Sequence, residues 1–374
     1  MSPSPGLLMT ILSFLACIGP LIFVHELGHY FVGRWCGVKA DVFSIGFGKE
    51  VAGWTDRRGT RWKVGWLPLG GYVKFKGDMN PASQPSDEWL ALPAEERAQT
   101  FQSKPLWQRA LIVAAGPVIN FLLAILLFMG IFAAIGYPTA PPLVTGVVAG
   151  GPAALAGVAP GDLMVSLNGR EVSNFAQVKD YVMLRPAQSV ELVIERDVGR
   201  LTVPTTTGVT TVKDRFGNEA KIGTLGVYST AIALEKLPLS QLPGRAVAQT
   251  SDTVQAMVLT LGQLITGKRS VKELGGPLKI AQVSGQQASL GWLPFFWLMA
   301  VISINLGFIN LLPIPLLDGG HLLFYGIEAV RRKPLKPEAQ EWAFRTGLAA
   351  LLALMVFVTF NDLSSFGVWK HLGG

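Results

Sequence analysis

Long apolar blocks interrupt the polar sequence of this chain. About 20 apolar residues are needed to cross a hydrocarbon core of about 30 Å. Three stretches reach or approach that length without a formal charge, namely Leu7–Val24, Leu111–Tyr137 and Leu290–Leu317. A fourth, Thr346–Phe360, is shorter. The pattern therefore predicts four transmembrane helices.

The first apolar stretch has the position and hydropathy of a secretory signal peptide. However, no positively charged segment opens it, and no clear small-residue cleavage pattern precedes Val24. It also runs directly into the sequence His25-Glu26-Leu27-Gly28-His29. A disposable segment would not carry such residues, so we expect a permanent membrane helix.

The polar segments between the apolar blocks carry strand and turn signals. Val42–Phe75 predicts short strands separated by glycine turns. From Leu143 onward, the sequence predicts a short strand, a helix of small residues and an alternating strand that ends in an Asn168-Gly169 turn. A further strand is expected at Val190–Arg196, and Ser251–Ile265 has the periodicity of an amphipathic helix. The glycines expected at turns of the first segment are Gly53, Gly59, Gly65 and Gly70-Gly71.

Basic residues indicate the orientation in the membrane. They concentrate between the first two spans and again between the last two, which places both segments on the cytoplasmic side. The residues concerned are Arg34, Arg57, Arg58, Arg61, Lys63, Lys74 and Lys76, and then Arg331, Arg332, Lys333 and Lys336. An even number of spans puts both termini outside the cytoplasm, together with the segment from about Pro138 to Ser289.

Composition agrees with this organisation. Hydrophobic residues make up 50% of the 374 residues, charged residues make up 15%, and the mean hydropathy is +0.40. That balance is too apolar for an ordinary soluble domain and too interrupted for a pure helical bundle. The formal charge is +7, but no basic run interleaved with aromatics indicates a nucleic-acid partner. Cys17 and Cys36 are too few for a disulfide framework and are expected to be packing residues.

The sequence at the end of the first span predicts a metal site. Residues four apart lie on one face of a helix, so the imidazoles of His25 and His29 can converge on one tetrahedral Zn²⁺. Glu26 can reach a water beside them and suits a general base. A bare HExxH pattern also occurs by chance in proteins that are not enzymes. Here the motif ends an apolar run, where ionisable side chains usually mark function.

A catalytic zinc site needs a third protein ligand and an open position for water. Asp318 is the only acidic residue in the apolar stretch from Leu290 to Leu323. It could instead cap the helix that follows it, since Asp-Gly-Gly is a good turn sequence. A buried carboxylate needs a partner in either case, and the zinc would supply one.

Polar residues and prolines distinguish the third span from the others. Pro313 and Pro315 do not fit a regular helix, so the span should unwind beside the active site. Asn305 and Asn310 would then offer amides to a substrate backbone or to a developing oxyanion, although hydrogen bonding between helices is an alternative role for both. His321 could be a ligand, but capping or support of a ligand fits it better.

Together these motifs resemble the site-2 proteases, and among them the bacterial regulators of envelope stress. The resemblance covers nearly the whole chain and rests on His25-Glu26-Leu27-Gly28-His29, on the run from Asn310 to His321, and on a PDZ-like segment between spans two and three. It implies that His25, His29 and Asp318 bind zinc and that Glu26 is the catalytic base.

The same resemblance implies further roles and partners. Asn305 and Asn310 would bind substrate, and the family's Gly-x-Gly element on a membrane-associated hairpin looks like Gly46-Phe47-Gly48. An edge strand there could hold an unwound substrate by β-addition. Expected substrates are single-span membrane proteins, such as a shortened anti-sigma factor or signal-peptide remnants. The PDZ-like domain would bind a peptide or a substrate segment, or else exclude large substrates. Related proteins often carry two such domains, and only one is found here.

The predicted protein is thus a polytopic α-helical membrane protein of the bacterial inner membrane, with about four transmembrane helices, a membrane-associated β-hairpin region and an extracytoplasmic α+β PDZ-like domain. An alternative is a catalytically inactive membrane scaffold that binds partners through its PDZ-like domain. The predicted parts are residues 1–32 (first span), 33–105 (cytoplasmic hairpin region and loop), 106–137 (second span), 138–208 (PDZ-like domain), 209–289 (amphipathic-helix region), 290–330 (third span) and 331–374 (cytoplasmic loop and fourth span).

Overall fold

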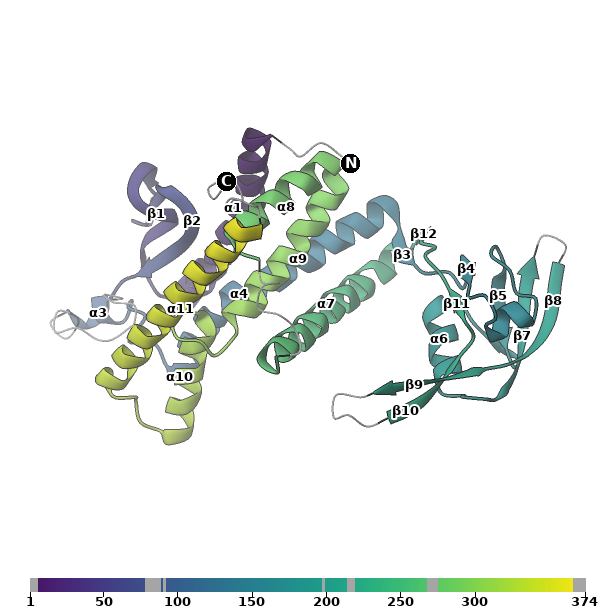
Figure 1. The fold of residues 1–374 in the computed structure, drawn as a ribbon. Helices are drawn as coiled ribbons and strands as arrows, with labels where there is room; N and C mark the ends of the chain where they lie inside the picture. Colours follow the sequence, from purple (N-terminus) through teal and green to yellow (C-terminus); the bar gives the residue numbers. More distant parts are fainter. Residues whose placement is uncertain are drawn as a thin grey trace, which may run out of the picture. The chain divides into compact units, whose positions relative to one another are not determined.

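The computed structural model describes residues 6–77, 89, 92–196, 199–213, 219–267 and 275–365. The chain forms two compact units. The helical unit comprises Met1–Ile131 and Leu242–Gly374, and the β-rich unit comprises Phe132–Gln241. Each unit has its own elements (Figure 1). Part of the cytoplasmic loop expected within 33–105 lies outside the described residues, and its described part contains the short helix α3 (Ala94–Arg97).

Four helices among the described residues are long and apolar enough to cross a membrane, as the hydropathy pattern predicted. They are α1 (Leu7–Trp35), α4 (Leu106–Ile135), α9 (Trp292–Asn310) and α11 (Pro337–Ser365). Helix α1 contains the His25–His29 motif, as expected, and ends at Trp35, slightly past the boundary expected at residue 32. Helix α11 extends beyond Thr346–Phe360 at both ends because the flanking polar residues are also helical.

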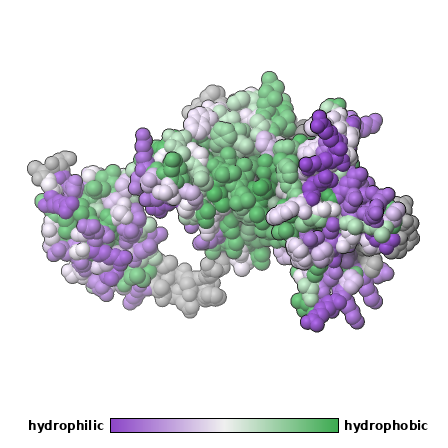
Figure 2. Space-filling model, turned by 180° about the vertical axis from the view of Figure 1, so that it is seen from behind, coloured by the Kyte–Doolittle hydropathy of each residue, from purple (hydrophilic) through white to green (hydrophobic). Residues whose placement is uncertain are grey.

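The outer surface of the helical unit is apolar. Figure 2 shows a broad hydrophobic area over its helices. The exposed large apolar side chains of these helices include Leu8, Leu12, Leu122, Leu126, Val356 and Phe360. Lipid tails solvate such side chains without cost, whereas water does not, so this surface suits a bilayer. Cys17 is buried and Cys36 is partly buried, and both are free thiols.

The predicted third span is broken, and the prediction that it unwinds is confirmed. Helix α8 (Pro277–Leu290) precedes it, α9 ends at Asn310, and helical structure resumes only with α10 (Asp318–Arg331). Pro313 and Pro315 fall in the break, where Leu316 adopts a φ of 81°. Non-helical backbone at this depth requires a protein or cavity environment.

The hairpin region forms one long antiparallel pair, β1 (Ala40–Thr55) and β2 (Arg61–Phe75). The prediction of several short strands is confirmed in part. Both strands are continuous, but Phe43 pairs with both Trp62 and Val73, so the segments on either side of the register irregularities have different partners. Of the glycines expected at turns, Gly59 lies in the connection over 56–60. The other glycines lie inside the strands at irregularities of the register. At Gly65 a Cβ would lie 2.5 Å from the carbonyl oxygen of Phe47, so glycine there permits close approach of the backbones rather than a turn.

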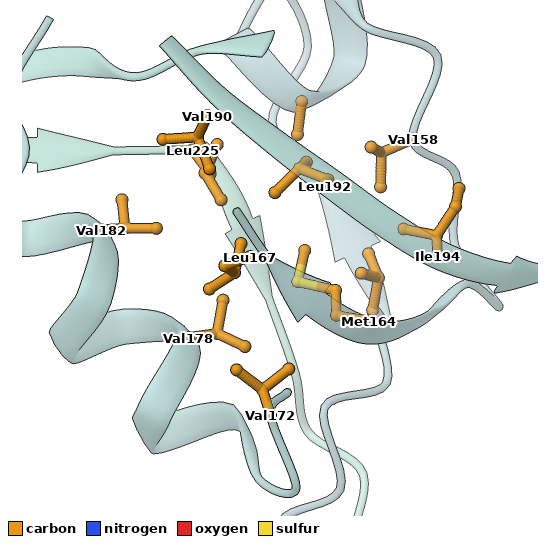
Figure 3. Packing of buried hydrophobic residues seen from close by; sticks show 12 residues of the cluster. Val158, Met164, Leu167, Val172, Val178, Val182, Val190, Leu192, Ile194 and Leu225 are labelled. Carbon is orange, nitrogen blue, oxygen red and sulfur yellow. The ribbon is translucent and has the colours of Figure 1, made fainter. Parts of the chain in front are cut away.

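The β-rich unit contains a four-stranded antiparallel sheet in the order β6-β5-β7-β8. Its strands are β5 (Leu163–Leu167), β6 (Arg170–Glu171), β7 (Ser189–Arg196) and β8 (Gly199–Thr206), with helices α5 (Pro152–Leu155) and α6 (Phe175–Met183). The predicted Asn168-Gly169 turn joins β5 to β6, with positive φ at both residues. Alternate residues of the sheet and one face of α6 form the core, which includes Met164, Leu167, Val178, Leu192 and Ile194 (Figure 3).

This unit extends past the boundary expected at residue 208. Two long-range strand pairs close it: β11 (Val227–Tyr228) pairs with β4 (Gly146–Val147), and β12 (Ala233–Glu235) pairs with β3 (Tyr137–Thr139). Strands β9 (Gly208–Lys213) and β10 (Glu219–Thr224) form another pair. Hydrophobic pattern alone does not reveal such short strands, because their pairing partners lie far away in the sequence.

A buried ion pair stabilises the sheet end of the β-rich unit. Arg196 donates from Nε to Asp162 Oδ1 at 2.6 Å and from a terminal nitrogen to Oδ2 at 2.7 Å. These hydrogen bonds, assisted by the backbone N–H of Ala159, hold the pKa of the Asp162 carboxyl below its usual value. The side chain of Asp162 is only 1% exposed, so the charge depends on these partners.

After a short 3₁₀ turn (Leu239–Gln241), helix α7 (Leu242–Ile265) returns the chain to the helical unit. It begins earlier than the predicted Ser251–Ile265 helix. The Gly275-Gly276-Pro277 sequence then starts α8, whose first backbone N–H groups are bound by Asp362 of α11. A carboxylate at a helix N-terminus satisfies amides that would otherwise lack partners.

Candidate metal centre

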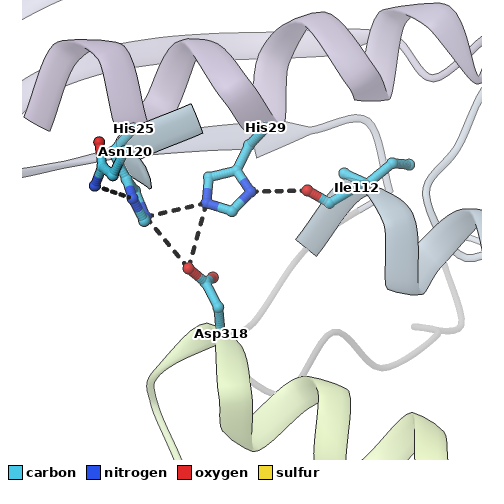
Figure 4. A network of polar contacts seen from close by, with 5 residues as sticks. All are labelled: His25, His29, Ile112, Asn120 and Asp318. Carbon is cyan, nitrogen blue, oxygen red and sulfur yellow. Dashed lines mark hydrogen bonds and ion pairs between the residues drawn. The ribbon is translucent and has the colours of Figure 1, made fainter. Parts of the chain in front are cut away.

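Helix α1 carries His25, Glu26 and His29, and Asp318 is the first residue of α10. Although Asp318 is far from α1 in the sequence, it faces both imidazoles (Figure 4). His25 and Glu26 are 7% and 8% exposed, so the cluster is buried. The close approach of α4 to α1 depends partly on Gly28, where a Cβ would lie 2.5 Å from the carbonyl oxygen of Ala115.

The three predicted ligands form a compact donor triangle. His25 Nε2 lies 3.2 Å from His29 Nε2 and 3.2 Å from Asp318 Oδ2, and His29 Nε2 lies 3.6 Å from the same oxygen. A tetrahedral zinc with ligands at about 2.0 to 2.1 Å separates its donors by about 3.3 to 3.4 Å. The observed triangle has this size. The three residues are therefore brought together as the sequence predicted, and their donor set fits zinc.

The orientation of the second imidazole also fits a metal ligand. His29 Nδ1 lies 2.9 Å from the carbonyl oxygen of Ile112 on α4, which only a protonated Nδ1 can satisfy. In the neutral ring, Nε2 then carries a lone pair directed at the triangle. Asp318 Oδ2 is buried and has no hydrogen-bond donor among the described residues. A cation at this point would compensate that oxygen.

A cavity of about 740 Å³ opens beside the triangle. Glu26 lines it, as do Asn310 at the end of α9 and Phe47 on β1. Strand β2 contributes Gly70, Gly71, Tyr72 and Val73 to the same wall. A site that contains a triad of donors, a second carboxylate and a strand along its wall can bind an extended peptide next to a reactive centre.

Some of the predicted substrate residues lie elsewhere. Asn305, Gly46 and Gly48 are not among the described residues that line this cavity. Gly46 and Gly48 instead have positive φ, 82° and 87°, on either side of Phe47. His321 lines the cavity, and its ring packs 5.1 Å from that of Phe344, which agrees with a supporting position rather than a ligand in the triangle.

Two residues of α4 that contact the imidazoles were not identified from the sequence. A Cβ on Gly116 would lie 2.2 Å from His29 Nε2, so only glycine leaves space for the triangle. Asn120 is fully buried, with Nδ2 3.0 Å from His25 Nδ1. The signal available for Asn120 was its isolation, since it is the one amide or charged residue in the apolar stretch Leu111–Tyr137. Nothing in the local sequence marks Gly116.

Comparisons with known proteins identify the family. The profile of Peptidase family M50 matches residues 13–354. The chain belongs to this family, the site-2 proteases. This chain is 45% identical to a protein of Agrobacterium fabrum, over 95% of this chain and 96% of that protein. The name of that protein assigns it provisionally to the zinc metalloproteases. Metalloprotease MmpA of Caulobacter vibrioides is 38% identical over 99% of both chains.

Among solved structures, the PDZ domain of an SdrC-like protein from Listeria monocytogenes is similar to 24% of this chain and 85% of that domain, with 17% identity and a TM-score of 0.19. Membership of family M50 makes this protein a zinc metalloprotease. With its apolar helices, it is embedded in a membrane, where its family finds its substrates.

Proposed function

We propose that this M50 protease hydrolyses peptide bonds within the transmembrane segments of single-span proteins, with zinc held by His25, His29 and Asp318. This proposal rests on the donor triangle, whose edges measure 3.2 to 3.6 Å and which is buried among the membrane helices. Three protein ligands leave a fourth tetrahedral position for water or substrate, as in catalytic rather than structural zinc sites. Shortened anti-sigma factors and signal-peptide remnants are suitable substrates in chemical terms, since each presents one apolar helix.

Glu26 and Asn310 supply the catalytic groups of the protein in this proposal. When bound, zinc polarises the attacking water and the scissile carbonyl. Glu26 follows the first ligand on α1 and lines the same cavity, so its carboxylate accepts the proton of the attacking water and later returns it to the leaving amine. Asn310 lines the same cavity and donates an amide N–H to the developing oxyanion.

Substrate binding needs an extended peptide, because a helix hides its peptide bonds. Gly70, Gly71, Tyr72 and Val73 line the cavity, and a Cβ on Gly71 would lie 2.9 Å from Cγ of Glu26. We infer that the substrate pairs with β2 at this point, beside the general base, with Phe47 packing on a substrate side chain. Asn305 and the glycines beside Phe47 would then shape the site without touching the peptide.

We also infer a bacterial inner-membrane location with both termini and the β-rich unit outside the cytoplasm. The support is the concentration of basic residues between the first two and the last two membrane helices. The β-rich unit would act as the PDZ-like module that holds a peptide or substrate segment at its sheet.

The test is cleavage of a labelled single-span peptide by the full chain in detergent, with and without a zinc chelator. The Glu26→Gln variant should lose at least about 100-fold in rate while binding zinc normally, because only the base is removed. Glu95→Gln, at an exposed position of α3, is the matched control and should cleave normally. Cleavage by Glu26→Gln at the normal rate would overturn the assignment. Cleavage by no version of the chain would favour the inactive scaffold.

A further inference from the structure

Asn120 is a fully buried amide in the apolar helix α4. Its backbone oxygen accepts a hydrogen bond from Ser303 Oγ of α9 at 2.8 Å, but its side chain points to the metal triangle (Figure 4). The amide nitrogen lies 3.0 Å from His25 Nδ1. Burying an amide in an apolar helix costs free energy unless it is hydrogen-bonded. The contact with His25 Nδ1 is the hydrogen bond that offsets this cost.

The two imidazoles face the same chemical requirement. A neutral imidazole has one N–H, and a metal ligand must keep the lone pair on the nitrogen that binds. When Nε2 binds, Nδ1 carries the proton and needs an acceptor. His29 finds one in the carbonyl oxygen of Ile112. For His25, the polar side chain at hydrogen-bonding distance of Nδ1 is Asn120.

The orientation of the Asn120 amide therefore decides whether His25 can bind a metal. With Nδ2 towards the ring, as in the structure, Nδ1 must accept, and the ring proton moves to Nε2, inside the triangle. With Oδ1 towards the ring, Nδ1–H donates and Nε2 is free. The two ends of an amide have nearly the same shape, and either orientation leaves one end without a protein partner among the described residues. Which orientation the amide adopts depends on which ring nitrogen of His25 carries the proton.

We propose that Asn120 is a positioning residue, which presents its Oδ1 to the Nδ1–H of His25 and so fixes the tautomer and ring orientation of that ligand. The inference rests on the zinc site of the proposed function. It makes α4 the common support of both imidazoles, since Ile112 and Asn120 belong to the same helix. Acceptors of this kind orient ligands and raise their basicity.

The test is zinc affinity, measured by competition with a chromophoric chelator on the full chain in detergent. Asn120→Leu keeps the side-chain size but removes the acceptor, and should weaken zinc binding roughly 10- to 100-fold. Asn120→Asp supplies an acceptor that does not donate, and should retain the wild-type affinity. Ser303→Ala is the packing control, because it removes a contact of the Asn120 backbone without touching the amide, and should bind zinc normally.

Equal losses in Asn120→Asp and Asn120→Leu would show that an acceptor at this position does not support zinc binding, and would overturn the inference. Normal affinity in Asn120→Leu would overturn it as well. A wild-type chain that binds no zinc would overturn the proposed function itself, which keeps the two failures distinct.

If Asn120→Asp does not fold, nitrogen NMR of histidine-labelled wild-type protein gives the same answer, since the chain has only four histidines. A protonated Nδ1 on His25 in the zinc-loaded protein supports the inference. A proton on its Nε2 overturns it.

Discussion

Adding one methyl group at Gly116 should abolish the metal site without unfolding the helix that carries it. A Cβ there would lie 2.2 Å from His29 Nε2 and 2.8 Å from His25 Nε2. Ordinary contacts begin at 3.4 Å, so the His29 ring would have to move by about 1.2 Å. Zinc ligands tolerate deviations of only about 0.2 Å. The helix itself does not oppose the change, because alanine is a better helix former than glycine by about 1 kcal/mol.

We expect Gly116→Ala to weaken zinc binding at least roughly 100-fold, about 2.7 kcal/mol, and to reduce cleavage by a similar factor. Chelator competition measures the affinity, and thermal unfolding in excess chelator shows whether the metal-free protein remains folded. Gly130→Ala is the matched control, because it lies on the same helix and its Cβ would meet nothing within 4 Å. If Gly116→Ala bound zinc as the wild type does, the packing of α4 against the imidazoles would be refuted.

Three further changes test other parts of the structure. Asp318→Asn should weaken zinc binding by more than about 100-fold in the same competition assay, because a neutral amide replaces a charged ligand. Arg196→Met should destabilise the β-rich unit by about 1 to 3 kcal/mol in denaturant unfolding. Because the pKa of Asp162 is lowered in the folded protein, its carboxylate stabilises the unit above about pH 4, and this stabilisation is lost as the pH falls through the lowered pKa. The Arg196→Met variant should therefore lose less stability on acidification than the wild type. Asp362→Ala should lower the thermal unfolding midpoint, since it leaves the backbone N–H of Gly276 without its acceptor.

Much of the architecture could be predicted from the sequence because it depends on the pattern of neighbouring residues. Four apolar stretches without charge predicted the membrane helices, and two prolines predicted the break between α9 and α10. The strands of the hairpin were less readable. Glycines within Val42–Phe75 indicate turns as well as close backbone approach, and only the pairing of β1 with β2 distinguishes the two.

The candidate site divides in the same way. The i, i+4 spacing of His25 and His29 follows from helix geometry, and Asp318 was noticeable as a lone carboxylate in an apolar stretch. Asn120 and Gly116 were not identified, because what matters about them is the side chain that faces them from another helix.

By itself the sequence determined the helices, the two halves of the metal site and their chemistry, since periodicity, hydropathy and donor type are properties of neighbouring residues. Only the tertiary structure decided that α4 lies against α1, that strand β2 borders the cavity next to Glu26, and that the three donors lie 3.2 to 3.6 Å apart. The physical reason is that these distances arise from packing between segments that are remote in the chain, and such packing depends on the shapes of both surfaces at once.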